Sequence, residues 1–169
     1  MARAQELGAH DSLEFLREID IINMRARSRT VGLVVRELGG DVKSKKIAVL
    51  GGAFKPDSDD VRDSPALDIA EQLRLLGAQV HLHDPKAIEG AKKKFPHIQY
   101  SESIDQIISG ADIVLHLTEW KEYREIDPSH VKALVNQAIL IDGRNMLDVE
   151  KWRAVGWKFI GLGRFTLSK

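Results

Sequence analysis

The chain has 169 residues, no cysteine, and 25 basic residues balanced by 25 acidic ones, so its formal net charge is zero. This length fits one ordinary domain with a short appendage, and a hydrophobic fraction of 43% is sufficient for a core. The composition excludes disulfides, thiolate metal sites and a cysteine nucleophile within the chain, and it gives no bulk field that would favour nucleic acid or an anionic membrane.

The first predicted element is one long amphipathic helix from Ser12 to Leu38. Apolar residues such as Leu13, Leu16 and Ile19 recur in it at three- and four-residue spacing, until a pair of glycines at positions 39 and 40 ends the pattern. A helix of this length cannot bury its whole apolar stripe on a small domain. We therefore expect it to pack against another chain or another domain.

After this helix, strand-like runs alternate with helical ones. Runs rich in β-branched and apolar residues predict strands at residues 46–50, 79–83, 112–117 and 138–141, with a late strand at 157–161. The best-marked helix runs from Pro65 to Leu76, with Ser64 as its N-cap and Gly77 after its end. Shorter helices are expected after Ser103, Asp127 and Asp148. The repeated order predicts an α/β fold with a doubly wound, Rossmann-like parallel sheet.

Three polar segments follow predicted strands and should meet at one rim of this sheet. They read GGAFKPDSDDVRDSP from residue 51, LTEW from residue 117 and DGRN from residue 142. Ligands of doubly wound sheets bind beyond the carboxyl ends of the strands. Lys55 offers a point charge there, Arg62 and Arg144 offer planar forks for phosphate oxygens, and the helix that opens at Ser64 offers backbone N–H groups. The sequence therefore predicts a site for a phosphorylated ligand.

Some of these residues have a simpler interpretation. The charged loop could be a solvated one in which Arg62 pairs with Asp59, Asp60 or Asp63. Trp120 could stack on a ligand or anchor its own loop.

Two other clusters are given structural interpretations. The run of His81, His83 and Asp84 could hold zinc, but a strand-ending turn is favoured and no metal is expected. The lysines at 92–94 are interpreted as a solvated helix face, so no nucleic-acid partner is expected. No apolar run is long enough to span a membrane and the first residues lack a secretion signal, so we expect a cytoplasmic protein without a membrane partner.

The segment from Gly51 to Pro65 resembles the GxAFKPxxDDxRxSP signature of the C-terminal domain of the UDP-glucose/GDP-mannose dehydrogenase family. LTEW followed by Tyr123, and IDGRN followed by Leu147 and Trp152, extend the resemblance in the family's order over nearly the whole chain. The sequence is most similar to the UDP-glucose 6-dehydrogenase subfamily. That resemblance implies oxidation of the sugar C6 alcohol of UDP-glucose to a carboxylate with two NAD⁺, through a covalent intermediate on a cysteine.

The resemblance also implies roles for individual residues. Phe54, Lys55 and Arg144 should contact the UDP-sugar, and Arg62 should reach toward NAD at a domain interface. Gly51, Asp60 and Asp142 should organise the loops. Gly52 departs from the family pattern, which has a larger apolar residue there.

The resemblance divides the chain into residues 1–40, similar to the end of the family's central dimerisation region, and residues 41–169, the UDP-sugar-binding α/β domain. The helix from Ser12 to Leu38 then predicts a homodimer. In the family, the catalytic cysteine lies just upstream of the segment that residues 1–16 resemble, and an N-terminal domain holds NAD. We therefore expect no catalytic residue in this chain and no turnover by it alone.

Two alternatives stay open. The chain could be a stand-alone nucleotide-binding or dimerisation module without catalysis. The sugar nucleotide could also be another UDP-sugar or a GDP-sugar, because the motifs do not settle the base or the sugar.

Overall fold

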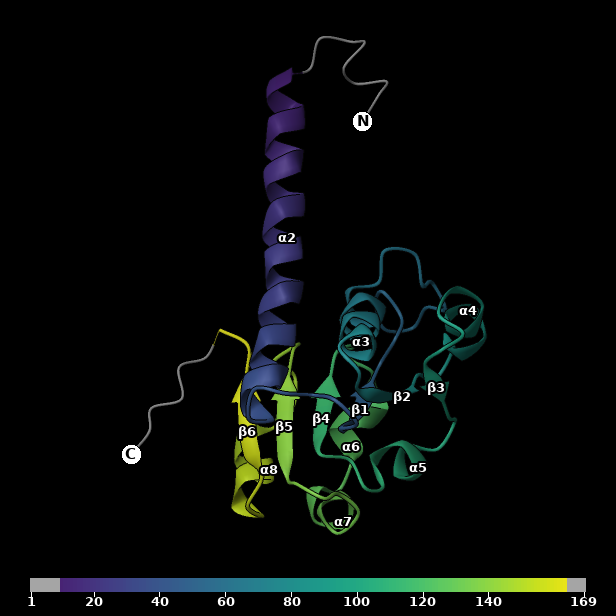
Figure 1. Ribbon diagram of the computed structural model, residues 1–169, viewed down its shortest axis with the longest axis vertical. Coiled ribbons are helices and arrows are strands. Elements are labelled where there is room, and N and C mark those ends of the chain that lie inside the picture. The colour runs from purple at the N-terminus through teal and green to yellow at the C-terminus, as the bar shows by residue number, and fades with distance from the viewer. Residues whose placement is uncertain (1–9, 164–169) are drawn as a thin grey trace.

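The structure is a computed structural model that describes residues 10–163, with side chains described from residue 16 onward. Its centre is a six-stranded, all-parallel sheet in the order β3-β2-β1-β4-β5-β6 (Figure 1). The strands are β1 Lys46–Leu50, β2 Gln79–His83, β3 Gln99–Tyr100, β4 Ile113–His116, β5 Ile139–Asp142 and β6 Lys158–Gly161. The register places Ile47 of β1 opposite Val80 of β2 and Ile113 of β4. The predicted α/β fold with a parallel, doubly wound sheet is confirmed.

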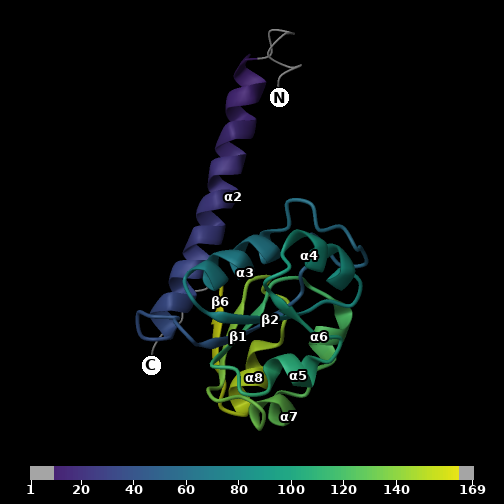
Figure 2. The same cartoon turned by 45° about the vertical axis from the view of Figure 1, so that its right-hand side comes forward.

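Helices cover both faces of the sheet, and the strands are apolar on both sides for that reason. Figure 2 shows α3 and α4 on one side of the strands and α5, α7 and α8 on the other. Ile47 and Val49 point into the first layer, whereas Ala48 and Leu50 point into the second. The helices are α2 His10–Glu37, α3 Pro65–Leu75, α4 Ile88–Lys94, α5 Ile104–Ile108, α6 Lys121–Glu125, α7 Pro128–Lys132 and α8 Val149–Ala154.

The capping residues identified in the sequence do begin helices. The side chain of Ser64 accepts a hydrogen bond from Leu67 N at the start of α3, and Ser103, Asp127 and Asp148 cap α5, α7 and α8 in the same way. Two elements lie outside the predicted set. The strand β3 has two residues, too few for a periodic pattern, and α6 begins after Trp120 without a side-chain cap.

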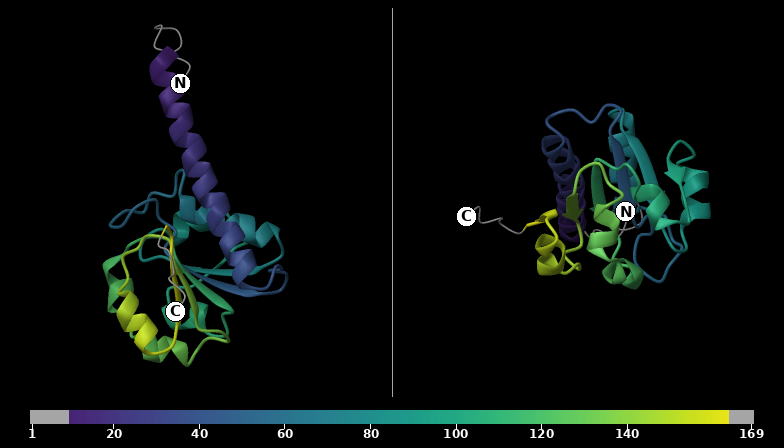
Figure 3. Two further views of the ribbon diagram at one scale, coloured as in Figure 1. Left: turned by 90° about the vertical axis from the view of Figure 1, so that its left-hand side faces the viewer. Right: turned by 90° about the horizontal axis from the view of Figure 1, so that it is seen from below.

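Helix α2 belongs only in part to the domain core. Val31 and Val34 are buried against the α3 side of the sheet, and α2 packs on α3. Earlier in the helix, Leu16, Ile19 and Ile22 are exposed, and that part projects beyond the domain (Figures 1 and 3). The side chain of Leu13 lies outside the described residues. Core contacts therefore cross the proposed division at residue 40, while most of the apolar stripe remains uncovered.

Among the described residues, no helix has the length and apolar character needed to cross a membrane.

Candidate functional site

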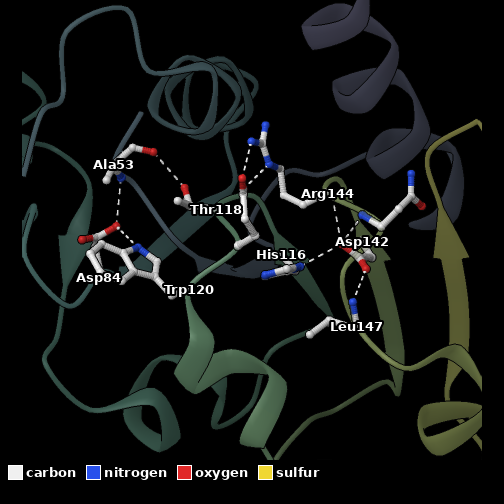
Figure 4. A network of polar contacts seen from close by, with 10 residues as sticks. Ala53, Asp84, His116, Thr118, Trp120, Asp142, Arg144 and Leu147 are labelled. Carbon is white, nitrogen blue, oxygen red and sulfur yellow. Dashed lines mark hydrogen bonds and ion pairs between the residues drawn. The ribbon is translucent and has the colours of Figure 1, made fainter. Parts of the chain in front are cut away.

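Three loops meet at the carboxyl ends of the neighbouring strands β1, β4 and β5. The loop after β1 spans residues 51–64, the turn after β4 spans residues 117–120, and the loop after β5 spans residues 143–148. Figure 4 shows polar contacts that join them. The rim predicted from the sequence is therefore formed by adjacent strands, where a doubly wound sheet binds its ligands.

The base of the first loop is held by a buried carboxylate on the next strand. Asp84, at the end of β2, is only 2% exposed. Its Oδ2 accepts hydrogen bonds from Gly52 N and Ala53 N, both at 2.8 Å, and from Trp120 Nε1 at 3.1 Å. Its Oδ1 accepts from Lys86 N at 2.9 Å and Ala87 N at 2.8 Å. Asp84 thus ends its strand in a turn and fixes the backbone that leads to Phe54.

Of the two interpretations of Trp120, the structure shows the anchoring one. The indole is buried and donates to Asp84, so it ties its own turn to the first loop.

Beyond Ala53, the charged part of the first loop closes on itself. Phe54 N donates to Asp60 O at 2.8 Å, and the Asp60 carboxylate accepts from the backbone and the guanidinium of Arg62. The hydrogen bond from the Arg62 side chain is the main cause that lowers the pKa of Asp60 to about 2. The Arg62 side chain is 86% exposed, so its pairing with Asp60 is the arrangement foreseen in the solvated-loop interpretation.

A second buried carboxylate organises the loop after β5. Asp142 Oδ1 accepts from Arg144 N at 3.0 Å and Asn145 N at 2.9 Å, and Oδ2 accepts from Leu147 N at 2.9 Å. His116 Nδ1 lies 2.7 Å from Oδ1 and completes the set. Burial raises the pKa of Asp142, but hydrogen bonds led by the one from His116 outweigh it, so the pKa lies below its ordinary value. The carboxylate therefore stays ionised inside the protein.

The side chain of Arg144 is oriented by the turn after β4. Its Nε and Nη2 bind the two carboxylate oxygens of Glu119, with the Nη2 contact at 2.8 Å. The hydrogen bonds in this pair lower the pKa of Glu119 and raise that of Arg144. A guanidinium has a second pair of N–H groups on its Nη1 side, which can still meet an anion.

A cavity of about 340 Å³ lies beside these loops, between α2, α3 and the strand ends. Phe54 and Arg144 line it, together with Leu117 and Gly143 from the rim. Pro65 and Ala66 bring in the first turn of α3, where the positive end of the helix dipole favours an anion. From α2 come Asn23, Ala26, Arg27 and Thr30.

The structure brings together some of the predicted site residues and separates others. Phe54 and Arg144 share the cavity, whereas Lys55 is exposed on the same loop and, like Arg62, is not among the described lining residues. Arg27 was missed by the sequence analysis. It pairs with Asp68 of α3, and no local pattern could reveal this because the two residues are 41 positions apart.

A larger hollow of about 680 Å³ lies elsewhere, between α4, α5 and α6. Its wall includes Glu89, Glu102, Asp105 and Glu122, and Lys86 is the one lysine among the described lining residues. This balance of charge disfavours a phosphorylated ligand, so the cavity beside α2 is the better candidate.

The sheet does not offer a dinucleotide its usual contacts. In dinucleotide-binding folds, a glycine-rich turn receives the pyrophosphate and an acidic side chain further along receives the ribose hydroxyls. Here the acidic residue after β2 is Asp84. Both of its carboxylate oxygens already accept hydrogen bonds, from five N–H groups of the protein in total. The residues present therefore do not fit NAD in this crevice.

Comparisons with known proteins find a matching family. The model of the UDP-glucose/GDP-mannose dehydrogenase family, UDP binding domain, matches residues 48–149. UDP-glucose 6-dehydrogenase YwqF of Bacillus subtilis (strain 168) is 33% identical over 156 residues, which are 92% of this chain and 35% of that protein. The chain spans about a third of the length of the curated relatives it matches.

Two solved structures are also similar. The UDP-glucose dehydrogenase from Pyrobaculum islandicum has a TM-score of 0.70 and 28% identity, over 86% of this chain and 31% of that one. The NDP-N-acetyl-D-galactosaminuronic acid dehydrogenase from Methanosarcina mazei Go1 has a TM-score of 0.70 and 27% identity, over 86% of this chain and 30% of that one. The fold alone therefore does not distinguish between sugars.

Proposed function

The chain belongs to the UDP-glucose/GDP-mannose dehydrogenase family, whose UDP binding domain it spans, and from this we propose that it forms the nucleotide-sugar half-site of an NAD-dependent UDP-glucose 6-dehydrogenase. One observation carries the proposal. Phe54 and Arg144, from loops after different strands, line the same cavity, and a buried aspartate fixes the backbone of each loop.

In this proposal, different residues of the cavity contact different parts of the ligand. Arg144 binds a phosphate through the guanidinium edge that Glu119 leaves open, and the first turn of α3 adds the positive end of a helix dipole. Phe54, 49% exposed, offers an aromatic face to the nucleotide sugar. Lys55 is next to it on an exposed stretch and reaches the ligand from outside the cavity.

The redox half of the reaction is proposed to lie elsewhere. Hydride transfer is the chemistry that NAD supplies, and we assign no step of it to residues of this chain. Arg62 is exposed and is proposed to contact NAD held by another domain. The 169 residues contain no cysteine, so no covalent intermediate can form on a thiol here, and we expect no oxidation of UDP-glucose by this chain alone.

The projecting part of α2 supports a homodimer. Leu16, Ile19 and Ile22 are exposed on a helix that extends beyond its own domain, and a second copy of the same helix would cover them. The same surface would serve a stand-alone dimerisation module, which is the second candidate function. We also propose a cytoplasmic location, which cell fractionation would test.

Isothermal titration calorimetry with UDP, UDP-glucose and GDP-mannose separates the candidates. We expect UDP and UDP-glucose to bind, and Arg144→Ala and Phe54→Ala each to weaken binding at least tenfold. Arg74→Ala is a matched control, because Arg74 also pairs with a glutamate but lies outside the cavity lining. A chain that dimerises but binds none of these nucleotides would support the stand-alone module and overturn the half-site. Tighter binding of GDP-mannose would move the proposal to a GDP-sugar.

A further inference from the structure

The turn after β4, residues 117–120, lies directly between the two binding loops. In each binding loop, the residue that lies against this turn is a glycine. Gly51 has φ +96°, and a Cβ there would lie 2.7 Å from Thr118 N. A Cβ at Gly143 would lie 2.9 Å from a methyl carbon of Leu117 and 3.2 Å from His116 O. The backbones of both loops are thus in close contact with the same short segment.

Within this turn, Thr118 is bonded to the first loop. Its hydroxyl donates to Ala53 O at 2.8 Å, and Thr118 is almost fully buried (Figure 4). Its partner Ala53 also gives its N–H to Asp84. Both polar groups of the Ala53 backbone are therefore fixed immediately before Phe54.

The adjacent residue, Glu119, is bonded to the second loop. It holds Arg144 through Nε and Nη2, and it is not among the described residues that line the cavity, whereas Arg144 is. Glu119 therefore holds the guanidinium without being one of the described residues that line the cavity. Two consecutive residues of one turn thus hold the loops that carry Phe54 and Arg144.

We propose that Thr118 and Glu119 are positioning residues that set the separation of Phe54 and Arg144 and so fix the nucleotide-sugar site before the ligand arrives. This inference rests on the proposed function. A site whose loops are already ordered loses less conformational freedom when it binds. Loosening either contact should then weaken binding without removing any group that touches the ligand.

The Thr118 contact is tested with a pair of nearly isosteric variants. Thr118→Val keeps the shape but removes the donor to Ala53 O. We expect it to raise the dissociation constant for UDP about fivefold, because the loop that carries Phe54 must then be ordered when the ligand binds. Thr118→Ser keeps the hydroxyl and should restore binding to within about twofold. Circular dichroism verifies that each variant is folded at the titration temperature. If Thr118→Val binds UDP as the unaltered chain does, Thr118 is only structural and its part of the inference is wrong.

The Glu119 contact is tested with a double-mutant cycle, which does not depend on the Thr118 variants. Glu119→Gln should weaken UDP binding about fivefold in the unaltered chain and should have no further effect beside Arg144→Ala. Glu71→Gln is the matched control, because Glu71 holds Arg74 through the same Nε and Nη2 groups on α3. It should leave the UDP affinity unchanged.

The outcomes separate this inference from the function on which it rests. If Glu119→Gln tightens UDP binding, the glutamate competes with the ligand and its proposed positioning role is overturned. If the unaltered chain binds UDP and neither Thr118→Val nor Glu119→Gln differs from it, the inference fails while the half-site stands. If the unaltered chain does not bind UDP, both are overturned.

Discussion

The buried carboxylate of Asp142 gives the sharpest prediction of stability. In Asp142→Asn the amide oxygen can replace Oδ1, which receives Arg144 N, Asn145 N and His116 Nδ1. The amide NH₂ group must then face Leu147 N, a buried donor that now has no acceptor. One unsatisfied buried N–H costs about 1–3 kcal/mol. The remaining hydrogen bonds are also weaker, because a neutral amide oxygen replaces a charged carboxylate oxygen as their acceptor. We expect a total loss of about 3 kcal/mol in the free energy of unfolding.

Urea denaturation followed by circular dichroism measures this loss. For a chain of this size, it should correspond to a fall in melting temperature of roughly 6–12 °C. The variant should also bind UDP more weakly, because the loop that carries Arg144 loses its anchor. Asp148→Asn is the matched control. Asp148 is an exposed N-cap of α8, and asparagine caps a helix about as well as aspartate.

The stability difference should depend on pH in a defined direction. The pKa of Asp142 is lowered by folding, so its contribution is present above the unfolded pKa of about 3.9 and is lost as pH falls through the lower folded value. The gap between the unaltered chain and Asp142→Asn should therefore be constant from about pH 5 to 8 and shrink below about pH 4. A loss under about 0.5 kcal/mol at pH 7, or a gap that widens in acid, would refute the reasoning.

Four further variants, one of them a control, test the fold and the proposed dimer surface. Gly51→Ala combines a left-handed backbone with a clash against Thr118 and should cost at least about 2 kcal/mol in urea denaturation, whereas Gly110→Ala, at φ +70° in open space, should cost only about 1 kcal/mol. Val34→Ala leaves a small cavity at a fully buried position and should lower the free energy of unfolding by about 2 kcal/mol. An unchanged urea midpoint would contradict this. Ile22→Glu, at an exposed α2 position, should leave the urea midpoint of the monomer unchanged but abolish a dimer in light scattering; a persisting dimer would place the interface elsewhere.

The sequence by itself determined the architecture and the edge of the sheet where the site lies. Hydrophobic runs, the helix caps at Ser64 and Asp148, and the alternation of strands and helices are local signals, and the parallel sheet follows from their order. The polar loops after β1 and β5 must then share one edge. Helix α6 and strand β3 escaped prediction because neither has a local signal strong enough to stand alone.

Only the tertiary structure decided which side chains face the cavity. Arg62 and Arg144 have the same chemistry, yet the first closes on Asp60 two residues away and the second, held by Glu119, lines the cavity. The direction of Arg144 depends on Glu119, 25 positions away, and the base of the loop that carries Arg62 is fixed by the buried Asp84, 32 positions from Gly52. Sequence periodicity describes neighbours along the chain, whereas these contacts exist only after strands remote in sequence lie side by side.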